Sequence, residues 1–532
     1  MNQVEVKRRQ IQYFSYALAC INLWVFGKNI GNNGLGYLAA AILVYALFWV
    51  LTGRNLTDKM SRILRSRNAR GQYGNVTRMR KNMMLFQMTE GFLGTLLCMI
   101  LGWLLLEKGF RVPYGSMILW ILSPTLFLRC IQSVFLGYFQ SEGSEMPSAV
   151  SCVLRQVFFL GLGLLFLTIF RTYGAKVSLL LRREDFTSMY GCMGIALGML
   201  ISEVLVLLFV FVIYRGSMSG RREPESGMKG TESFFTSLRV LLWNMGGDIL
   251  KDLLLLLPLW IGLLLFQKQS ADIYASVSVY GIFFGRYFIT MLLPATFFCT
   301  GILPGIAKIG SHIRKKEERY VKTAFQAGMQ GAIVHGLFFA ALFAVLAAPL
   351  GQAVGAGTGT AAQELFTTGS SLLLWLLLLF YFSEILELRS EQYLIFAGYG
   401  ILDIVSIISL VVLLNAENTA SALPLSLVLG TAAGSVTLGI LTCLRMKTWP
   451  DLLRTLAIPA GSCCACGLLA FGLEKILLPH LGAVVTVLLE LAITSLVYWL
   501  LLFMLRCFRG QDFACVSGGK FLRALGKTFR LL

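Results

Sequence analysis

The stretch SMYGCMGIALGMLISEVLVLLFVFVIY, residues 188–214, contains one charged side chain, Glu203. About 20 apolar residues in a helix are enough to cross the roughly 30 Å hydrocarbon core of a bilayer, and this stretch is longer. A helix that is apolar on every side is either buried in a large core or surrounded by lipid. The stretch therefore predicts a membrane-spanning helix that carries a carboxylate inside it.

Thirteen further apolar stretches are long enough to cross a bilayer, and the charged residues fall almost entirely between them. Only 14% of the residues are charged and 57% are hydrophobic, whereas about one quarter of the residues in a soluble domain are charged. We therefore expect an all-α polytopic membrane protein with about 14 transmembrane helices. The predicted spans are residues 11–30, 36–53, 83–106, 113–137, 148–170, 188–214, 236–266, 275–307, 322–349, 365–386, 392–414, 421–444, 453–473 and 481–505.

The distribution of basic residues predicts how these helices are oriented. The N-terminus, the alternate loops and the tail carry 32 Lys and Arg, whereas the other loops carry 9. By the positive-inside rule the richer set faces the cytoplasm, which places both termini on the inner side of the membrane. The net charge of +19 is therefore a topology signal and predicts contact with anionic lipid headgroups, not with nucleic acid.

The order of apolar and polar segments predicts a duplicated lobe. Residues 215–231 are rich in Gly, Ser and charge and predict a cytoplasmic linker after the sixth span. In each set of six spans the first span ends in a similar polar turn, at residues 31–39 and 267–275, and internal repeats of this kind are a usual plan of secondary transporters. The predicted parts are an N-terminal lobe with the linker, a C-terminal lobe, a helix pair and a basic amphipathic tail, at residues 1–230, 231–446, 447–508 and 509–532.

The sequence offers little for an enzyme. It has no Gly-rich phosphate loop, no HExxH pair and no catalytic Ser motif, so we expect no cofactor and no catalysis. His335 is a candidate for membrane acyltransferase chemistry, and the alternative is a histidine that packs between helices. Cys463, Cys464 and Cys466 have no His or carboxylate nearby, so they are interpreted as packing residues and not as a metal site.

Ionisable side chains inside the spans are the candidate functional residues. Each costs roughly 2.5–3.5 kcal/mol at a helix centre and normally faces a cavity or a partner. The cations of this kind are Arg129, Arg155, Arg239, Lys251 and Arg286. Arg286 has no acidic residue within a helical turn, and its planar guanidinium suits a phosphate. The alternative is that it pairs across helices with Asp403, Glu384 or Glu90.

The other buried cations carry different expectations. The helical face of Arg129 predicts an inward polar stripe formed with Gln132, Ser133 and Gln140. Arg155 and Arg239 lie near the predicted cytoplasmic ends of their spans and are expected to snorkel to the interface. The candidate cations for binding a phosphate are Arg286, Arg129 and Lys251.

Buried acids and prolines complete the set of candidates. Asp248, Lys251 and Asp252 share one face of the seventh span, where they can pair internally. The candidates for ion or proton coupling, or for pairing, are Asp248, Asp252, Glu90 and Asp403, and Glu203 and Glu490 are further buried acids. Candidate hinges are Pro258, Pro294 and Pro304, which interrupt the hydrogen bonding of the seventh and eighth spans.

Three segments resemble a known family. Residues 30–38, IGNNGLGYL, are similar to the Leu-Gly-x-x-Gly-x-Gly turn after the first helix of polysaccharide and sporulation-type members of the MOP flippase superfamily. Residues 137–149, GYFQSEGSEMPSA, resemble the Gly-Tyr-Phe-Gln-Gly-x-Gly-x-x-x-Pro-Thr-Ala segment between their helices four and five. Residues 280–307 resemble their eighth helix. The motif residues are Gly31, Gly34, Gly36, Gly137, Tyr138, Gln140, Gly143 and Pro147.

The resemblance implies two six-helix lobes of the MATE-like fold around a central cavity, plus two C-terminal helices that form a lipid-accessible groove. It implies a monomer that moves a polyprenyl-pyrophosphate-linked oligosaccharide, a cell-wall or surface polysaccharide precursor, to the outer leaflet. The first span lacks the arginines typical of lipid II flippases. A MATE-type multidrug antiporter is an alternative, although the first span has no acid and Arg286 is a cation. A non-transporting scaffold for envelope or spore assembly is another.

Overall fold

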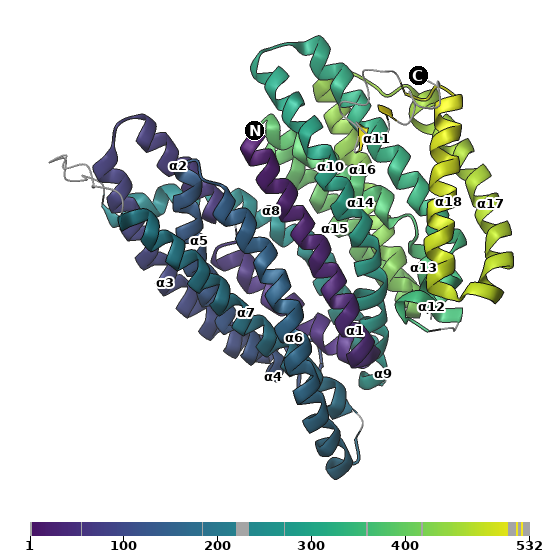
Figure 1. Ribbon diagram of the computed structural model, residues 1–532, viewed down its shortest axis with the longest axis horizontal. Helices are drawn as coiled ribbons and strands as arrows, with labels where there is room; N and C mark the ends of the chain where they lie inside the picture. Colours follow the sequence, from purple (N-terminus) through teal and green to yellow (C-terminus); the bar gives the residue numbers. More distant parts are fainter. Residues whose placement is uncertain are drawn as a thin grey trace. The chain divides into compact units, whose positions relative to one another are not determined.

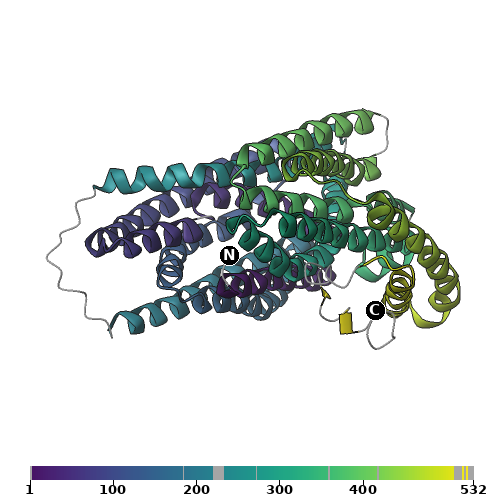
Figure 2. The ribbon, with the colours of Figure 1, turned by 90° about the horizontal axis from the view of Figure 1, so that it is seen from above.

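The computed structural model consists of helices (Figures 1 and 2). It describes residues 3–508 except residues 55, 184, 220–232, 271, 358–359 and 416–418, and in the tail it describes only residues 518–519 and 523–524. Over these ranges there is no strand, which confirms the all-α fold class. Most of the predicted linker and of the predicted amphipathic tail lies outside the described residues.

The chain divides into two compact units. Unit 1 contains Met1–Trp24 and Ile282–Leu532, and unit 2 contains Val25–Gly281. The first part of the first helix thus groups with the C-terminal helices, and the seventh predicted span groups with the N-terminal ones. A helix belongs to the unit whose surfaces it packs against, and this need not follow chain order. The predicted lobes, residues 1–230 and 231–446, are therefore made of different helices from the compact units, and their role as moving bodies stays a prediction.

Unit 2 contains the second part of α1 and every helix up to α9. The elements are α1 (Gln3–Thr52), α2 (Leu56–Ala69), α3 (Tyr73–Trp103), the π-helix η1 (Leu104–Gly109), α4 (Gly115–Leu122), α5 (Pro124–Ser141), α6 (Met146–Leu181), α7 (Asp185–Ser219), α8 (Phe234–Gln269) and α9 (Ile273–Gly281). Helices α6 and α7 pack closely along their lengths (Figure 1). Glycine permits this contact, because a Cβ at Gly198 would lie 2.6 Å from the Cα of Gly163.

Unit 1 contains the start of α1 and the helices after α9. The elements are the π-helix η2 (Ile282–Phe288), α10 (Ile289–Arg314), α11 (Glu318–Val345), α12 (Ala347–Val354), α13 (Thr360–Gly369), α14 (Leu372–Leu388), α15 (Gln392–Asn415), α16 (Thr419–Met446), the π-helix η3 (Leu453–Ala457), α17 (Ile458–Leu481) and α18 (Ala483–Met504). Helices α17 and α18 lie side by side (Figures 1 and 2). They expose large apolar side chains such as Leu468 and Leu488, as expected for a surface that contacts lipid.

The predicted spans are present as helices. In the described part of the chain, thirteen helical segments are long and apolar enough to cross a membrane. The first of them, residues 3–69, contains both of the first two predicted spans, because α1 continues through a kink at Gly31. Gly31 has a φ of 72°, which an L side chain rarely adopts, so this glycine permits the bend that separates the two spans. The fold is that of a multi-pass membrane protein.

Candidate functional site

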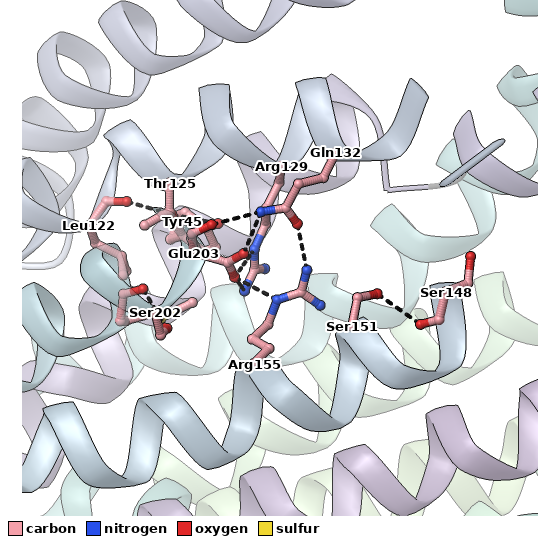
Figure 3. Close-up of polar contacts among 11 residues, drawn as sticks. Tyr45, Leu122, Thr125, Arg129, Gln132, Ser148, Ser151, Arg155, Ser202 and Glu203 are labelled. Atoms are coloured by element: carbon pink, nitrogen blue, oxygen red, sulfur yellow. Dashed lines mark hydrogen bonds and ion pairs between the residues drawn. The ribbon is translucent and has the colours of Figure 1, made fainter. Parts of the chain in front are cut away.

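Glu203 of α7 lies at the centre of a buried polar cluster in unit 2 (Figure 3). Its side chain is fully buried, and its Oε1 lies 2.6 Å from Nη2 of Arg129 and 2.8 Å from Nε of Arg155. Nε of Arg129 also donates a hydrogen bond to Oε1, at 2.7 Å. One carboxylate therefore pairs with two guanidinium groups.

Gln132 closes the cluster by contacting both kinds of charge. Its amide nitrogen donates to the backbone carbonyl of Glu203 at 3.0 Å and to Oε2 of the same residue at 3.2 Å. Its amide oxygen accepts a hydrogen bond of 2.8 Å from Nη2 of Arg155. Because each group is held by at least one other, the side chains are fixed in a ring of contacts (Figure 3). We name Arg129, Gln132, Arg155 and Glu203 the Glu203 cluster.

Three helices position the Glu203 cluster. Arg129 and Gln132 are three residues apart and share one face of α5, while Arg155 comes from α6. Close contact between α6 and α7 brings Arg155 next to Glu203. Gly194 makes this contact possible, because a Cβ there would lie 2.4 Å from the backbone oxygen of Phe166. Glycine in the sixth span thus lets α7 come close enough to α6 for Glu203 to contact Arg155.

Aromatic side chains of α1 cover Arg129. Its guanidinium carbon lies 4.7 Å from the ring centre of Trp49 and 5.7 Å from that of Tyr45. Thr125 fixes the Tyr45 hydroxyl through a hydrogen bond of 2.8 Å. These rings add cation–π attraction and restrict the guanidinium to one orientation. The side chains of Arg129 and Arg155 are 13% and 19% exposed, so part of each remains accessible.

The charge of the Glu203 cluster is its main chemical property. Two guanidinium groups and one carboxylate give a net charge of plus one in an environment where unbalanced charge is costly. Such an arrangement attracts anions and repels cations. Of the predicted polar stripe, Arg129 and Gln132 lie in this cluster, whereas Ser133 donates to the carbonyl of Cys130 and Gln140 to Ser148. Arg155, which was expected to snorkel to the interface, instead pairs with the Glu203 carboxylate on another helix.

Further ion pairs in unit 2 involve the predicted acids of α8. Lys59 lies 2.8 Å from Asp248, and Arg54 lies 3.6 Å from Asp252. The Arg54 guanidinium also lies over Trp49, at 5.5 Å. Both carboxylates thus have cation partners on other elements, which the predicted pairing within one helix face did not include. Glu90 instead accepts a hydrogen bond from the side-chain amide of Gln87.

Arg286 lies in unit 1, within the π-helix η2, and is buried. Its guanidinium packs against Gly355, the C-terminal cap of α12, where a Cβ would lie 3.5 Å from Cζ. The carbonyl groups at such a helix end favour a cation. Of its predicted partners, Glu384 is bound by Arg9 through hydrogen bonds of 3.0 and 3.1 Å. Sequence reasoning missed Arg9, since the start of the first helix was read as a topology signal.

The three predicted phosphate-binding cations come from both units. Arg129 and Lys251 belong to unit 2 and Arg286 belongs to unit 1, so a single site formed by all three stays a prediction. Asp403 is buried in α15, and within the described residues neither of its carboxylate oxygens has a hydrogen-bond partner. Its coupling role likewise stays a prediction. Among the described residues, no group of three or more His, Cys, Asp or Glu is arranged to hold a metal ion.

The glycine motifs of the sequence are packing and turn positions. A Cβ at Gly36 would lie 2.0 Å from the backbone oxygen of Val277, and one at Gly34 would lie 2.7 Å from Cβ of Ile30, so both positions require glycine. Gly137 lets α5 approach α2, with a would-be Cβ 3.3 Å from the Thr57 oxygen.

The remaining motif residues form the connection from α5 to α6. Tyr138 is buried under the guanidinium of Arg80, and the Gln140 amide donates to Ser148 at 3.0 Å. Gly143 has a φ of 84° after α5, and Pro147 occupies the first turn of α6, where no backbone N–H is needed. The motif therefore indicates the fold and not a ligand site.

The candidate hinges and the histidine are also located. Pro258 lies inside α8, and Pro294 and Pro304 lie inside α10, where hinge motion stays a prediction. Nδ1 of His335 lies 2.7 Å from the carbonyl of Gly331, and its ring packs edge-on against Phe298 and Trp499. These contacts are those of a histidine that packs between helices.

Comparison with known proteins places this arrangement in context. No family model matches the chain. Stage V sporulation protein B of Bacillus subtilis (strain 168) is 26% identical over 227 residues, which are 42% of this chain and 40% of that protein. The match therefore spans less than half of the relative.

Solved structures share the fold over most of the chain. A multidrug resistance MATE family transporter of the MOP superfamily, in an inward-facing conformation, matches with a TM-score of 0.63 at 14% identity, over 84% of this chain and 98% of that one. The lipid II flippase MurJ, in an inward closed conformation, matches with a TM-score of 0.63 at 12% identity, over 93% and 98%. The resemblance predicted from the sequence motifs is thus confirmed, and the chain has the fold of the MOP superfamily.

Proposed function

We propose that this protein is a flippase that moves a polyprenyl-pyrophosphate-linked oligosaccharide from the inner to the outer leaflet by alternating access. The observation that carries the proposal is the Glu203 cluster, in which two arginines share one carboxylate among apolar helices. The lipid II flippase is one of the structures that share the fold. The membrane-spanning helices and the basic loops support a bacterial plasma membrane location with both termini in the cytoplasm.

The chemistry of the cluster favours an anionic headgroup. A guanidinium can bind two phosphate oxygens at once through parallel N–H groups, and Glu203 does not neutralise both arginines. The side chains of Arg129 and Arg155 are 13% and 19% exposed, which supports access of a ligand to the cluster. In the proposed mechanism the lipid tail stays in the bilayer beside α17 and α18, and residues 1–214 move against residues 236–446.

The test is transport of a fluorescent polyprenyl-pyrophosphate sugar across the membrane of proteoliposomes. Arg129→Gln is expected to slow transport by about tenfold or more, because a lost charge-assisted hydrogen bond is worth about 1.5–3 kcal/mol. Arg239→Gln is the matched control, since this arginine is exposed on α8. Arg286→Ala tests whether the second predicted cation contributes as well.

A double variant separates transport from folding. Arg129→Gln combined with Glu203→Gln removes one charge of each sign and leaves Arg155 as the remaining cation. If the double variant unfolds at the temperature of the unmodified protein and still transports slowly, the cluster acts on the substrate. Transport at the unmodified rate would mean that Arg129 and Glu203 only hold the helices together. No transport of several such lipids by folded protein would contradict the flippase proposal itself.

A MATE-type multidrug antiporter is the second candidate, because the multidrug transporter matches with the same TM-score as the lipid II flippase. Export of an organic cation requires an acidic group, and the buried carboxylate of Asp403 is available for that role. Export of a cationic dye that Asp403→Asn abolishes, without movement of the lipid-linked sugar, would favour this candidate.

A further inference from the structure

Unit 1 contains a pocket of about 400 Å³, and neither residue of the Arg9–Glu384 ion pair lines it. The walls come from the C-terminal ends of α10, α14 and α16 and from the start of α11. Figure 1 shows the connection between α10 and α11 at the end of this unit where the N-terminus also lies. Its basic lining residues are Lys316, Lys322, Arg389, Arg445 and Lys447, and its acidic ones are Glu317 and Glu318.

Short contacts hold part of this lining in place. Oε2 of Glu317 lies 2.5 Å from Nδ1 of His312. Arg445 lies 3.2 Å from Glu391, and its backbone carbonyl accepts a hydrogen bond of 2.9 Å from Arg389. The two arginines are therefore fixed in the wall by their neighbours.

The three lysines of the pocket are placed differently. Within the described residues the ammonium groups of Lys316, Lys322 and Lys447 form no ion pair. Lys316 and Lys447 follow the ends of α10 and α16 with φ values of 59° and 49°, a conformation in which glycine is the usual residue. A lysine there carries a conformational cost that glycine would not.

Helix dipoles account for only part of this charge. The C-terminal ends of α10, α14 and α16 each favour a nearby cation. Lys322, however, belongs to the second turn of α11, where no such dipole favours it. Five basic and two acidic side chains line the pocket, and Glu391 neutralises Arg445 beside it, so the formal excess is two positive charges.

We propose that this pocket binds a phosphate group, supplied either by an anionic phospholipid or by a soluble phosphate compound. Lysine binds phosphate as a point charge and arginine binds it through its planar fork, and both types line the pocket. Basic pockets between membrane helices bind anionic lipid headgroups by this chemistry. All of the lining residues belong to unit 1, and the site does not depend on the proposed flippase activity.

The test measures binding to the purified full chain, without transport. Calorimetry in a neutral detergent uses inorganic phosphate and pyrophosphate as probes. Native mass spectrometry counts bound phosphatidylglycerol against phosphatidylcholine. Combining Lys316→Gln, Lys322→Gln and Lys447→Gln is expected to weaken binding about tenfold or more, because charge-assisted hydrogen bonds are lost.

A matched control uses three exposed basic residues near the connection between α10 and α11 that do not line the pocket: Lys308→Gln, Lys315→Gln and Arg319→Gln. This variant removes the same charge and is expected to change binding by less than about twofold, because none of its side chains lines the pocket and salt screens charges that act from outside it. Equal loss in both triple variants would show diffuse surface attraction and would overturn the proposal. So would absence of binding of every probe to the unmodified protein.

A second variant keeps the test valid if the glutamine variant folds poorly. Lys316→Gly with Lys447→Gly removes two cations and relieves the left-handed strain, so it is expected to unfold at the same or a higher temperature while it binds more weakly. Retained binding in this stable variant would contradict the proposal. If the lysine variants lose binding of phosphatidylglycerol alone, the ligand is a lipid headgroup. If they lose binding of inorganic phosphate, the ligand is a soluble phosphate compound.

Discussion

The Glu203 cluster of unit 2 and the Arg9–Glu384 pair of unit 1 use the same chemistry with different charge balance. In unit 1 one guanidinium meets one carboxylate through two parallel hydrogen bonds of 3.0 and 3.1 Å. In unit 2 one carboxylate serves two guanidinium groups. In a balanced pair the two charges cancel, and the pair holds two helices together. An unbalanced cluster has one positive charge left, which attracts a further anion. The stoichiometry of the charges therefore distinguishes a structural contact from a candidate ligand site.

The largest expected effect follows from removing the shared carboxylate. Glu203→Gln leaves Arg129 and Arg155 buried without a counterion and is expected to lower the free energy of unfolding by about 3–5 kcal/mol. Thermal unfolding in detergent measures this loss. A bound anion should recover part of it, so addition of pyrophosphate is expected to raise the unfolding temperature of this variant. An unchanged unfolding temperature in Glu203→Gln would mean that this carboxylate does not stabilise Arg129 and Arg155. The Glu203 cluster would then not differ from the Arg9–Glu384 pair in the way described.

A smaller effect is expected at the balanced pair. Arg9→Gln leaves Glu384 partly buried without its cation and is expected to cost about 1–3 kcal/mol of stability. The double variant Arg9→Gln with Glu384→Gln should recover most of this cost, because no charge is left alone. Transport by the double variant is expected to stay within about twofold of the unmodified rate. A tenfold loss of transport in a stable double variant would show that the pair does more than join helices.

The smallest effect is expected at the aromatic cover of the cluster. Trp49→Leu removes the ring closest to Arg129 and is expected to weaken substrate binding by about 0.5–2 kcal/mol, the usual range of a cation–π contact. The concentration dependence of transport measures this change, with Trp243→Leu as a control because Trp243 is 87% exposed on α8. An equal change in both variants would mean that Trp49 does not orient Arg129.

Part of the candidate site could be predicted from the sequence. Arg129 and Gln132 share a helix face, and this spacing alone places both on the inner side of α5. Arg155 could not be assigned in the same way, because its partner lies on α7 and the pairing depends on glycine contacts between α6 and α7. The partner of Glu384 was also missed, because Arg9 lies far from it along the chain and was read as a topology signal.

The sequence by itself determined the membrane-spanning helices and the glycine-containing motifs that resemble the MOP superfamily, whereas the polar turn predicted at residues 31–39 is a kink at Gly31 within α1. These are local properties, because the apolar length of a segment and the backbone freedom of a glycine do not depend on distant partners. Only the tertiary structure decided that residues 1–24 pack with unit 1, that α8 packs with unit 2, and that two arginines share Glu203. Buried charges are stabilised by whichever opposite charge the packing of helices brings near, and that choice is made in three dimensions.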